Sequence, residues 1–182
     1  MIKALAVDMD GVVIKSHKVF SLRFSEQKGI ALDKIMKFVK SDFQDCMVGK
    51  KDLKKVLPNY LKEWGVEDSL DSVLDFWFSG EEVIDEGALE KVRELRRKGV
   101  KCYLATNNEK YRVEYMTEKL KTEFDGIIAS YELGYKKPNQ KFYEEFMKRI
   151  GIKDPGEVEL WDNDEENIKG AQEAGMKAKL WE

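Results

Sequence analysis

The apolar residues of the chain follow two different periods. Residues 2–7 form a short, nearly continuous apolar run that ends in carboxylates at Asp8 and Asp10, which is typical of a strand buried on both faces of a parallel sheet. Over residues 15–80 the apolar positions instead recur at helical spacing. Examples are Ile35, Val39, Phe43, Leu53, Leu57, Leu61, Leu70 and Leu74. The pattern predicts a buried first strand followed by a helical insertion.

After Gly87 the chain alternates between helical and extended patterns. The predicted helices cover residues 88–98, 109–120, 139–150 and 164–174, and the predicted strands cover 100–105, 126–129, 157–161 and 176–180. Strands that alternate with helices of about 10–15 residues indicate an open parallel sheet with right-handed crossovers and helices on both faces. The expected class is therefore α/β with a five-stranded parallel sheet.

Composition narrows the possible partners. The 182 residues include 32 Lys and Arg against 35 Asp and Glu, which gives a net charge of −3. The charges are interspersed and form no basic stripe, so a nucleic-acid partner is not expected. The sequence contains no stretch of roughly 18 uncharged apolar residues, so a membrane span is not expected. Asp8 interrupts the first apolar run before it reaches signal-peptide length. Cys46 and Cys102 stand far apart beside apolar residues, as expected of reduced, packed thiols in a cytoplasmic protein.

The His and Cys content limits the metal chemistry. One His and two Cys cannot supply a structural zinc site with four such ligands, so a bound metal should be a hard cation held by oxygen. His17 has no second His or suitable Cys close to it in the sequence. A solvated or packed histidine is therefore expected there, and a Ser-His-Asp hydrolase is disfavoured.

Polar residues gather where the predicted strands end. In an open parallel sheet, ligands bind outside the carboxyl ends of the strands, so these positions are the candidate site. They are Asp8, Asp10, Thr106, Asn107, Asn108, Lys137, Asp162, Asn163 and Asp164. Two carboxylates two residues apart can act as nucleophile and proton donor beside a shared metal. Taken singly, these residues have ordinary alternatives. Asp8 and Asp10 could form an acidic turn or a pair that only binds metal, Thr106 could be structural, and Lys137 could be a solvated lysine.

Four segments, taken in order, carry a resemblance to a known family. VDMDGVV, LATNN, GYKKP and WDNDEENIKGAQEAG resemble the four signature motifs of the haloacid dehalogenase superfamily of aspartate-nucleophile hydrolases. The closest likeness is to small sugar-phosphate phosphatases with a helical cap. The resemblance implies a Rossmann-like catalytic core over residues 1–14 and 83–182, with an all-helical cap inserted at residues 15–82.

The resemblance also implies a role for each motif residue. Asp8 would be the nucleophile that takes the phosphoryl group, and Asp10 the general acid and base. Thr106 and the backbone amide of Asn107 would hold phosphoryl oxygens, and Lys137 would pair with the nucleophile and the phosphate. Mg²⁺ would bind the Asp8 carboxylate and the Asp10 backbone carbonyl, and would keep several waters. An acid at position 10 favours a phosphatase over a dehalogenase, because a halide leaves without a proton.

The fourth motif departs from the usual pattern. Asp162 occupies its first position and Asn163 its second, where the family normally presents an acidic metal ligand. Either residue is a candidate ligand. Asn163 offers a carbonyl oxygen without a negative charge, so we expect weaker Mg²⁺ binding that Asn163→Asp would tighten.

These observations predict a Mg²⁺-dependent phosphomonoesterase that acts on a small phosphorylated metabolite, with a sugar phosphate as a candidate. The alternatives are a phosphomutase of the same family and a catalytically weakened small-molecule binding protein. We expect a monomer or a weak dimer. Two sets of cap residues could contact substrate or belong to the cap's own core and solvated surface: the aromatic residues Phe20, Phe24, Trp64, Trp77 and Phe78, and the basic residues Lys18, Arg23 and Lys28.

Overall fold

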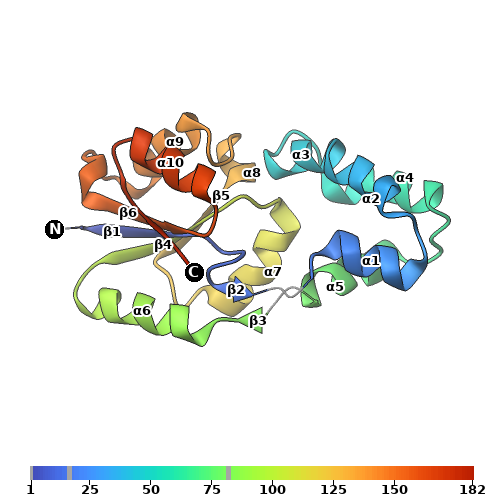
Figure 1. Ribbon diagram of the computed structural model, residues 1–182, viewed down its shortest axis with the longest axis horizontal. Coiled ribbons are helices and arrows are strands. Elements are labelled where there is room, and N and C mark those ends of the chain that lie inside the picture. Colours follow the sequence, from blue (N-terminus) through green and yellow to red (C-terminus); the bar gives the residue numbers. More distant parts are fainter. Residues whose placement is uncertain (1, 16–17, 81–82) are drawn as a thin grey trace.

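The computed structural model describes residues 2–15, 18–80 and 83–182. Within these ranges the chain forms a lobe built on a sheet and a lobe built from helices, which lie side by side in Figure 1. His17 lies outside the described residues, so its expected environment stays a prediction. Of the predicted boundary between cap and core at residues 82 and 83, the structure describes only residue 83.

The first lobe contains the parallel sheet. Its strands are β1 (Ala4–Val7), β4 (Lys101–Thr106), β5 (Gly126–Ala129), β6 (Val158–Asp162) and β7 (Lys177–Leu180). Their order is β5-β4-β1-β6-β7, with Ala4 opposite both Lys101 and Val158. Every residue of β1 is buried, as its uninterrupted apolar run requires for a central strand. The predicted five-stranded parallel sheet is confirmed.

Helices cover both faces of this sheet (Figure 1). α6 (Glu86–Arg97) and α7 (Lys110–Leu120) pack on one face, and α9 (Gln140–Ile150) and α10 (Glu165–Glu173) on the other. A side-chain carboxylate or amide caps the N-terminus of each of these helices. The capping residues are Asp85, Glu109, Asn139 and Asp164. A single turn α8 (Ser130–Leu133) and a 3₁₀ turn η1 (Pro155–Glu157) complete the described lobe.

The second lobe is the helical cap. It comprises α1 (Phe20–Lys28), α2 (Leu32–Val39), α3 (Asp42–Met47), α4 (Leu53–Glu63) and α5 (Leu70–Ser79). Aromatic side chains fill its interior, and Phe20 and Trp77 stack with ring centroids 4.1 Å apart. The cap aromatics whose role was open therefore form the cap's own core. They are Phe20, Phe24, Trp64, Trp77 and Phe78.

The basic residues of the cap that were candidates for a second anion site have partners within the cap. Lys18 pairs with Glu26 at 2.6 Å and Lys28 with Asp68 at 2.7 Å. The Arg23 guanidinium donates to backbone carbonyls of α5. These contacts support the interpretation of the three residues as ordinary cap residues.

The two lobes connect through a short antiparallel pair. β2 (Ile14–Lys15) pairs with β3 (Val83–Ile84), and the backbone N–H of Asp85 donates to the Val13 carbonyl at 2.8 Å. The sequence did not indicate these strands or α8, because two to four residues are too few to show a period. The pair brings the described ends of the predicted insertion together beside the sheet.

Two further predictions concern the described residues. Cys46 and Cys102 are both buried and form no disulfide, as expected of packed thiols. Of the helices that the structure describes, none is both long enough and apolar enough to cross a bilayer.

Candidate active site

The charged centre of the site is a buried lysine between two carboxylates. Asp8 follows β1, Asp162 ends β6, and Lys137 comes from the segment between α8 and α9. The Lys137 ammonium lies 2.9 Å from Asp8 Oδ1 and 2.5 Å from Asp162 Oδ2. The side chains of Lys137 and Asp162 are wholly inaccessible to solvent. Buried charges are rarely tolerated unless they are paired in this way.

Burial and the neighbouring charges have opposite effects on the pKa values of Asp8 and Lys137. Burial raises the pKa of Asp8 to about 7, although the Lys137 ammonium opposes that rise. Burial alone would lower the pKa of Lys137, but the carboxylates of Asp8 and Asp162 outweigh it and raise the pKa. Lys137 therefore remains a cation beside the Asp8 carboxylate, for which the family resemblance implies the role of nucleophile.

Asn107 holds the backbone of Lys137 in place. The Lys137 N–H donates to Asn107 Oδ1 at 2.8 Å, and Asn107 Nδ2 donates to the Lys137 carbonyl at 2.9 Å. This pair of bonds joins the end of β4 to the segment that carries the lysine. The side chain of Asn107, for which only a role of the backbone amide was expected, thus fixes the position of Lys137.

The two candidate metal ligands of the fourth motif lie in different surroundings. Both oxygens of Asp162 accept hydrogen bonds, from the Asp164 N–H at 2.9 Å, from Asn167 Nδ2 at 3.1 and 3.2 Å and from Lys137. Asn163 is exposed, and its side-chain amide lies against Gly11, just after Asp10. A Cβ atom at Gly11 would lie 2.3 Å from Asn163 Nδ2, and Gly11 has a φ of +95°. Glycine at position 11 leaves the space that the Asn163 side chain fills.

Asp10 is held at both carboxylate oxygens. Asn108 Nδ2 donates to Asp10 Oδ2 at 2.5 Å and to Thr106 Oγ1 at 2.7 Å, and Arg112 Nη2 lies 3.2 Å from Asp10 Oδ1. Thr106 is 1% exposed. The sequence-predicted residues Asp10 and Thr106 are thus joined through Asn108.

The role of Arg112 was not predicted, although the sequence contains a weak signal for it. Arg112, Met116 and Leu120 recur every four residues on the buried side of α7, so a charged residue stands on the apolar stripe of an amphipathic helix. Arg112 is only 3% exposed. A buried arginine needs a partner, but nothing in the sequence identifies Asp10, which is 102 residues away.

The available ligands suit a hard, partly hydrated cation. Within residues 2–15, 18–80 and 83–182, no three His, Cys, Asp or Glu side chains come together as a metal site. Asp8 offers a carboxylate and Asn163 an amide carbonyl, and the resemblance adds the backbone carbonyl of Asp10. Mg²⁺ typically takes one or two carboxylates and keeps several waters, so this small set of oxygen donors fits Mg²⁺ and does not fit zinc.

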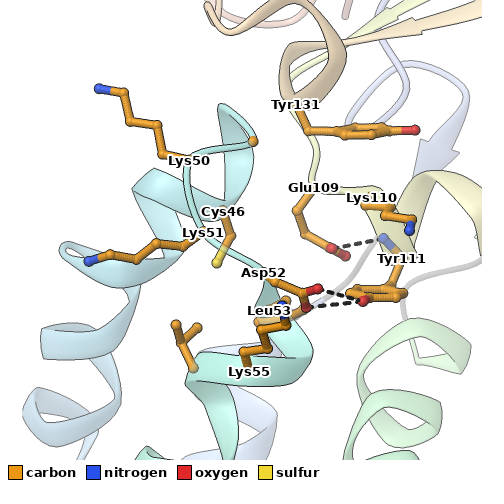
Figure 2. Close-up of a pocket in the computed structure, with 12 residues that line it drawn as sticks. Cys46, Lys50, Lys51, Asp52, Leu53, Lys55, Glu109, Lys110, Tyr111 and Tyr131 are labelled. Carbon is orange, nitrogen blue, oxygen red and sulfur yellow. Dashed lines mark hydrogen bonds between the residues drawn. The ribbon is translucent and has the colours of Figure 1, made fainter.

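A cavity of about 540 Å³ lies between cap and core, and its walls come from both lobes. Figure 2 shows Lys50, Asp52 and Lys55 of the cap on one side and Glu109 and Tyr111 of the core on the other; the Tyr111 hydroxyl donates to Asp52 Oδ1 at 3.0 Å. Burial raises the pKa of Glu109 to about 7, against the effect of the N–H groups that donate to it.

A second hollow of about 870 Å³ reaches Lys137. Val48 and Lys50 of the cap line it together with Tyr135, Lys136 and Lys137 of the core. Both hollows therefore have walls from the two lobes, and the segment after α3, which contains Lys50, contributes to each.

Comparisons with known proteins show which family the chain resembles in sequence. Residues 2–175 match the family of haloacid dehalogenase-like hydrolases. A glyceraldehyde 3-phosphate phosphatase from Methanothermobacter thermautotrophicus is 40% identical over 57 residues, which is 31% of this chain and 25% of that protein. Enolase-phosphatase E1 from Aquifex aeolicus is 22% identical over 97% of this chain and 88% of its own length.

A solved structure has the same fold over the full length. A haloacid dehalogenase family enzyme from Bacteroides thetaiotaomicron, crystallised with magnesium and inorganic phosphate, superposes with a TM-score of 0.85. The superposition covers 100% of this chain and 95% of that one at 24% identity. At this identity the likeness establishes the fold.

Proposed function

Because the chain belongs to the haloacid dehalogenase-like hydrolases, we propose that it is a Mg²⁺-dependent phosphomonoesterase of a small phosphorylated metabolite. The observation that carries the proposal is the Lys137 ammonium, 2.9 Å from the Asp8 carboxylate. Phosphoryl transfer requires an aligned nucleophile and positive charge near the phosphoryl oxygens. A buried carboxylate and ammonium at the carboxyl end of a central strand meet both requirements.

The reaction proceeds in two steps. In the first, an Asp8 oxygen attacks phosphorus, the bond from phosphorus to the ester oxygen breaks, and Asp10 gives its proton to that oxygen as the alcohol leaves. In the second, water attacks the aspartyl-phosphate, Asp10 takes the proton of the water, and inorganic phosphate leaves with the Asp8 carboxylate restored. Thr106 and the Asn107 N–H hold phosphoryl oxygens, and Lys137 offsets their negative charge.

Asn163 is the side chain of the fourth motif that we assign to the metal. The oxygens of Asp162 already accept hydrogen bonds from protein groups, whereas the Asn163 amide lies beside Gly11. Asp8, the Asp10 carbonyl and Asn163 would hold Mg²⁺. When bound, the cation supplies positive charge that offsets the charge of the transferring phosphoryl group. With one acidic ligand fewer than the usual pattern, the site needs a higher magnesium concentration.

The substrate class follows from several observations together. Asp10 provides a proton that an alkoxide needs and a halide does not, which favours phosphate esters over haloacids. The two relatives named above are both phosphatases by name, and one of them is a glyceraldehyde 3-phosphate phosphatase. The second hollow is lined by Lys50, Lys136 and Lys137, and such ammonium groups favour an anionic metabolite such as a sugar phosphate. A mutase would need an activating bisphosphate, so phosphate release without one distinguishes the two reactions.

The test is phosphate release from 4-nitrophenyl phosphate across a magnesium titration. We expect release that depends on magnesium and falls on the order of 10⁴-fold in Asp8→Asn. Asp33→Asn, an exposed position in α2, is the matched control and should behave as wild type. Release that is unchanged in Asp8→Asn or in excess chelator contradicts the proposal. Binding of phosphate esters without turnover supports the binding-protein alternative.

A further inference from the structure

Arg112 connects the cap to Asp10. Its Nη2 lies 3.2 Å from Asp10 Oδ1, while its Nη1 donates to the carbonyl of Phe78 at 3.0 Å. Phe78 belongs to the last turn of α5, close to the point where the chain leaves the cap, whereas Arg112 lies in the first turn of α7. One guanidinium, carried by the core helix α7, thus contacts both the loop after β1 and the cap.

The guanidinium itself is firmly held. The side chain of Arg112 is 4% exposed, and its backbone N–H donates to Glu109 Oε1 at 2.6 Å. The Phe78 ring centroid lies 5.9 Å from the guanidinium carbon. A planar, buried guanidinium loses little freedom when it forms further hydrogen bonds, so it can serve as a fixed reference for a more mobile group.

Asp10 is the more exposed of the two. It stands in the loop after β1 with 46% of its side chain exposed, and without partners its carboxylate could rotate away from the site. A general acid must stay within about 2.6–3.2 Å of the atom that receives its proton. Asn108 fixes one oxygen of Asp10 and Arg112 fixes the other. An arginine keeps its own protons at all working pH values, so it orients Asp10 without competing for the transferred proton.

We propose that Arg112 is a positioning residue, which holds Asp10 at the leaving-group oxygen and makes that placement depend on the seated cap through Phe78. The inference rests on the proposed phosphatase function. Because Arg112 acts on the reaction through the proton that Asp10 delivers, its loss matters most for esters whose alcohol is a poor leaving group. An ester with a good leaving group departs with little help from an acid.

The experiment compares kcat/KM for phenyl, 4-nitrophenyl and 2,4-dinitrophenyl phosphate, which differ in leaving ability and little in shape. In Arg112→Met we expect a loss of about 10- to 100-fold with phenyl phosphate and of about 3-fold or less with the dinitrophenyl ester. Arg112→Lys keeps the charge and should show a smaller change in the same direction. If Arg112→Met does not fold, the Arg112→Lys variant tests the proposal instead. In Asp10→Asn, adding Arg112→Met should cause little further loss with phenyl phosphate.

Arg23 provides the matched control. Its guanidinium also donates to carbonyls of α5, those of Phe76 and Trp77, and no contact joins it to Asp10. Arg23→Met should therefore leave the ratio between the three esters as in the wild type. Equal losses on all three esters in the Arg112 variants, an increase in rate, or a loss that adds fully to that of Asp10→Asn would overturn the inference and leave the proposed function standing. A wild type that hydrolyses none of the esters overturns both.

Discussion

The two lobes bury different chemistry. The core buries charge, with the Lys137 and Asp162 side chains fully inaccessible and bonded to each other. The cap buries aromatic side chains. Among the described residues, the Trp64 indole nitrogen is the one buried side-chain nitrogen or oxygen that lacks a hydrogen-bond partner. The interior of the cap can therefore contribute stability but not chemistry, and any role of the cap in recognition falls to its surface facing the core.

Polar contacts join the two lobes. Ser130 Oγ donates to the Met47 carbonyl at 2.6 Å, and Lys136 donates to Gln44. A Cβ atom at Gly49 would lie 2.3 Å from the Tyr131 carbonyl, so the cap segment after α3 lies directly on the turn α8. Polar interfaces of this kind suit lobes that separate and close again, because water can replace each contact at low cost.

The largest effect should come from breaking the buried charge cluster of the core. Lys137→Met leaves the Asp8 and Asp162 carboxylates without their ammonium, which we expect to lower the free energy of unfolding by about 3–5 kcal/mol and to abolish phosphate release. Urea denaturation and the aryl phosphate assay measure the two effects. Lys141→Met, exposed on α9, is the control; a Lys137→Met protein as stable as this control would show that the cluster does not depend on its cation.

A cavity in the cap should act on one lobe only. Phe38 is fully buried, with the Tyr60 ring centroid 4.9 Å away, so Phe38→Ala should cost about 3 kcal/mol. Hydrogen exchange should then show faster exchange in α1–α5 and unchanged protection in β1, β4 and β6. Equal loss of protection in the sheet would mean that the lobes unfold as one unit.

The family and the sheet could be predicted because their signals are local. A continuous apolar run marks β1 and helical periods mark the cap. Three of the four motifs stand at strand ends, and the third follows α8. The family match over residues 2–175 confirms the resemblance that the four motifs carry. The five strands of the parallel sheet differ from the predicted ones by at most two residues at either end. The predicted bounds of the cap, residues 15 and 82, stay predictions. The oligomeric state also stays a prediction.

The connections within the site could not be predicted from the sequence. Asn107 to Lys137 and Arg112 to Asp10 join residues 30 and 102 positions apart, and neither contact leaves a periodic trace. Which oxygen of Asp162 accepts from Lys137 depends on how β6 meets the segment carrying Lys137. The sequence could therefore indicate which residues belong to the site, while the partner of each side chain required the structure.

A smaller change should restore the charge that the fourth motif lacks. Asn163→Asp places a carboxylate where the amide lies beside Gly11, and affinity for hard cations rises with ligand charge. We expect the magnesium concentration for half-maximal phosphate release to fall about tenfold. Asp164→Asn, one residue on, removes a charge at the helix N-cap and should not tighten magnesium binding. An unchanged titration in Asn163→Asp would remove position 163 from the metal site.

The smallest effect should come from loosening one contact between the lobes. Tyr111→Phe removes the hydroxyl that donates to Asp52 and leaves the bond by which Asp52 caps α4. Losing one such bond costs about 1 kcal/mol, or about fivefold in an equilibrium constant. We expect KM to rise by about that factor with kcat nearly unchanged, since the cap closes less often but the core is intact. Tyr131→Phe removes a hydroxyl at the same cavity whose partner, Glu132, belongs to the core, and KM should not change. A fall in kcat in Tyr111→Phe would mean that this contact between the lobes also positions groups in the core.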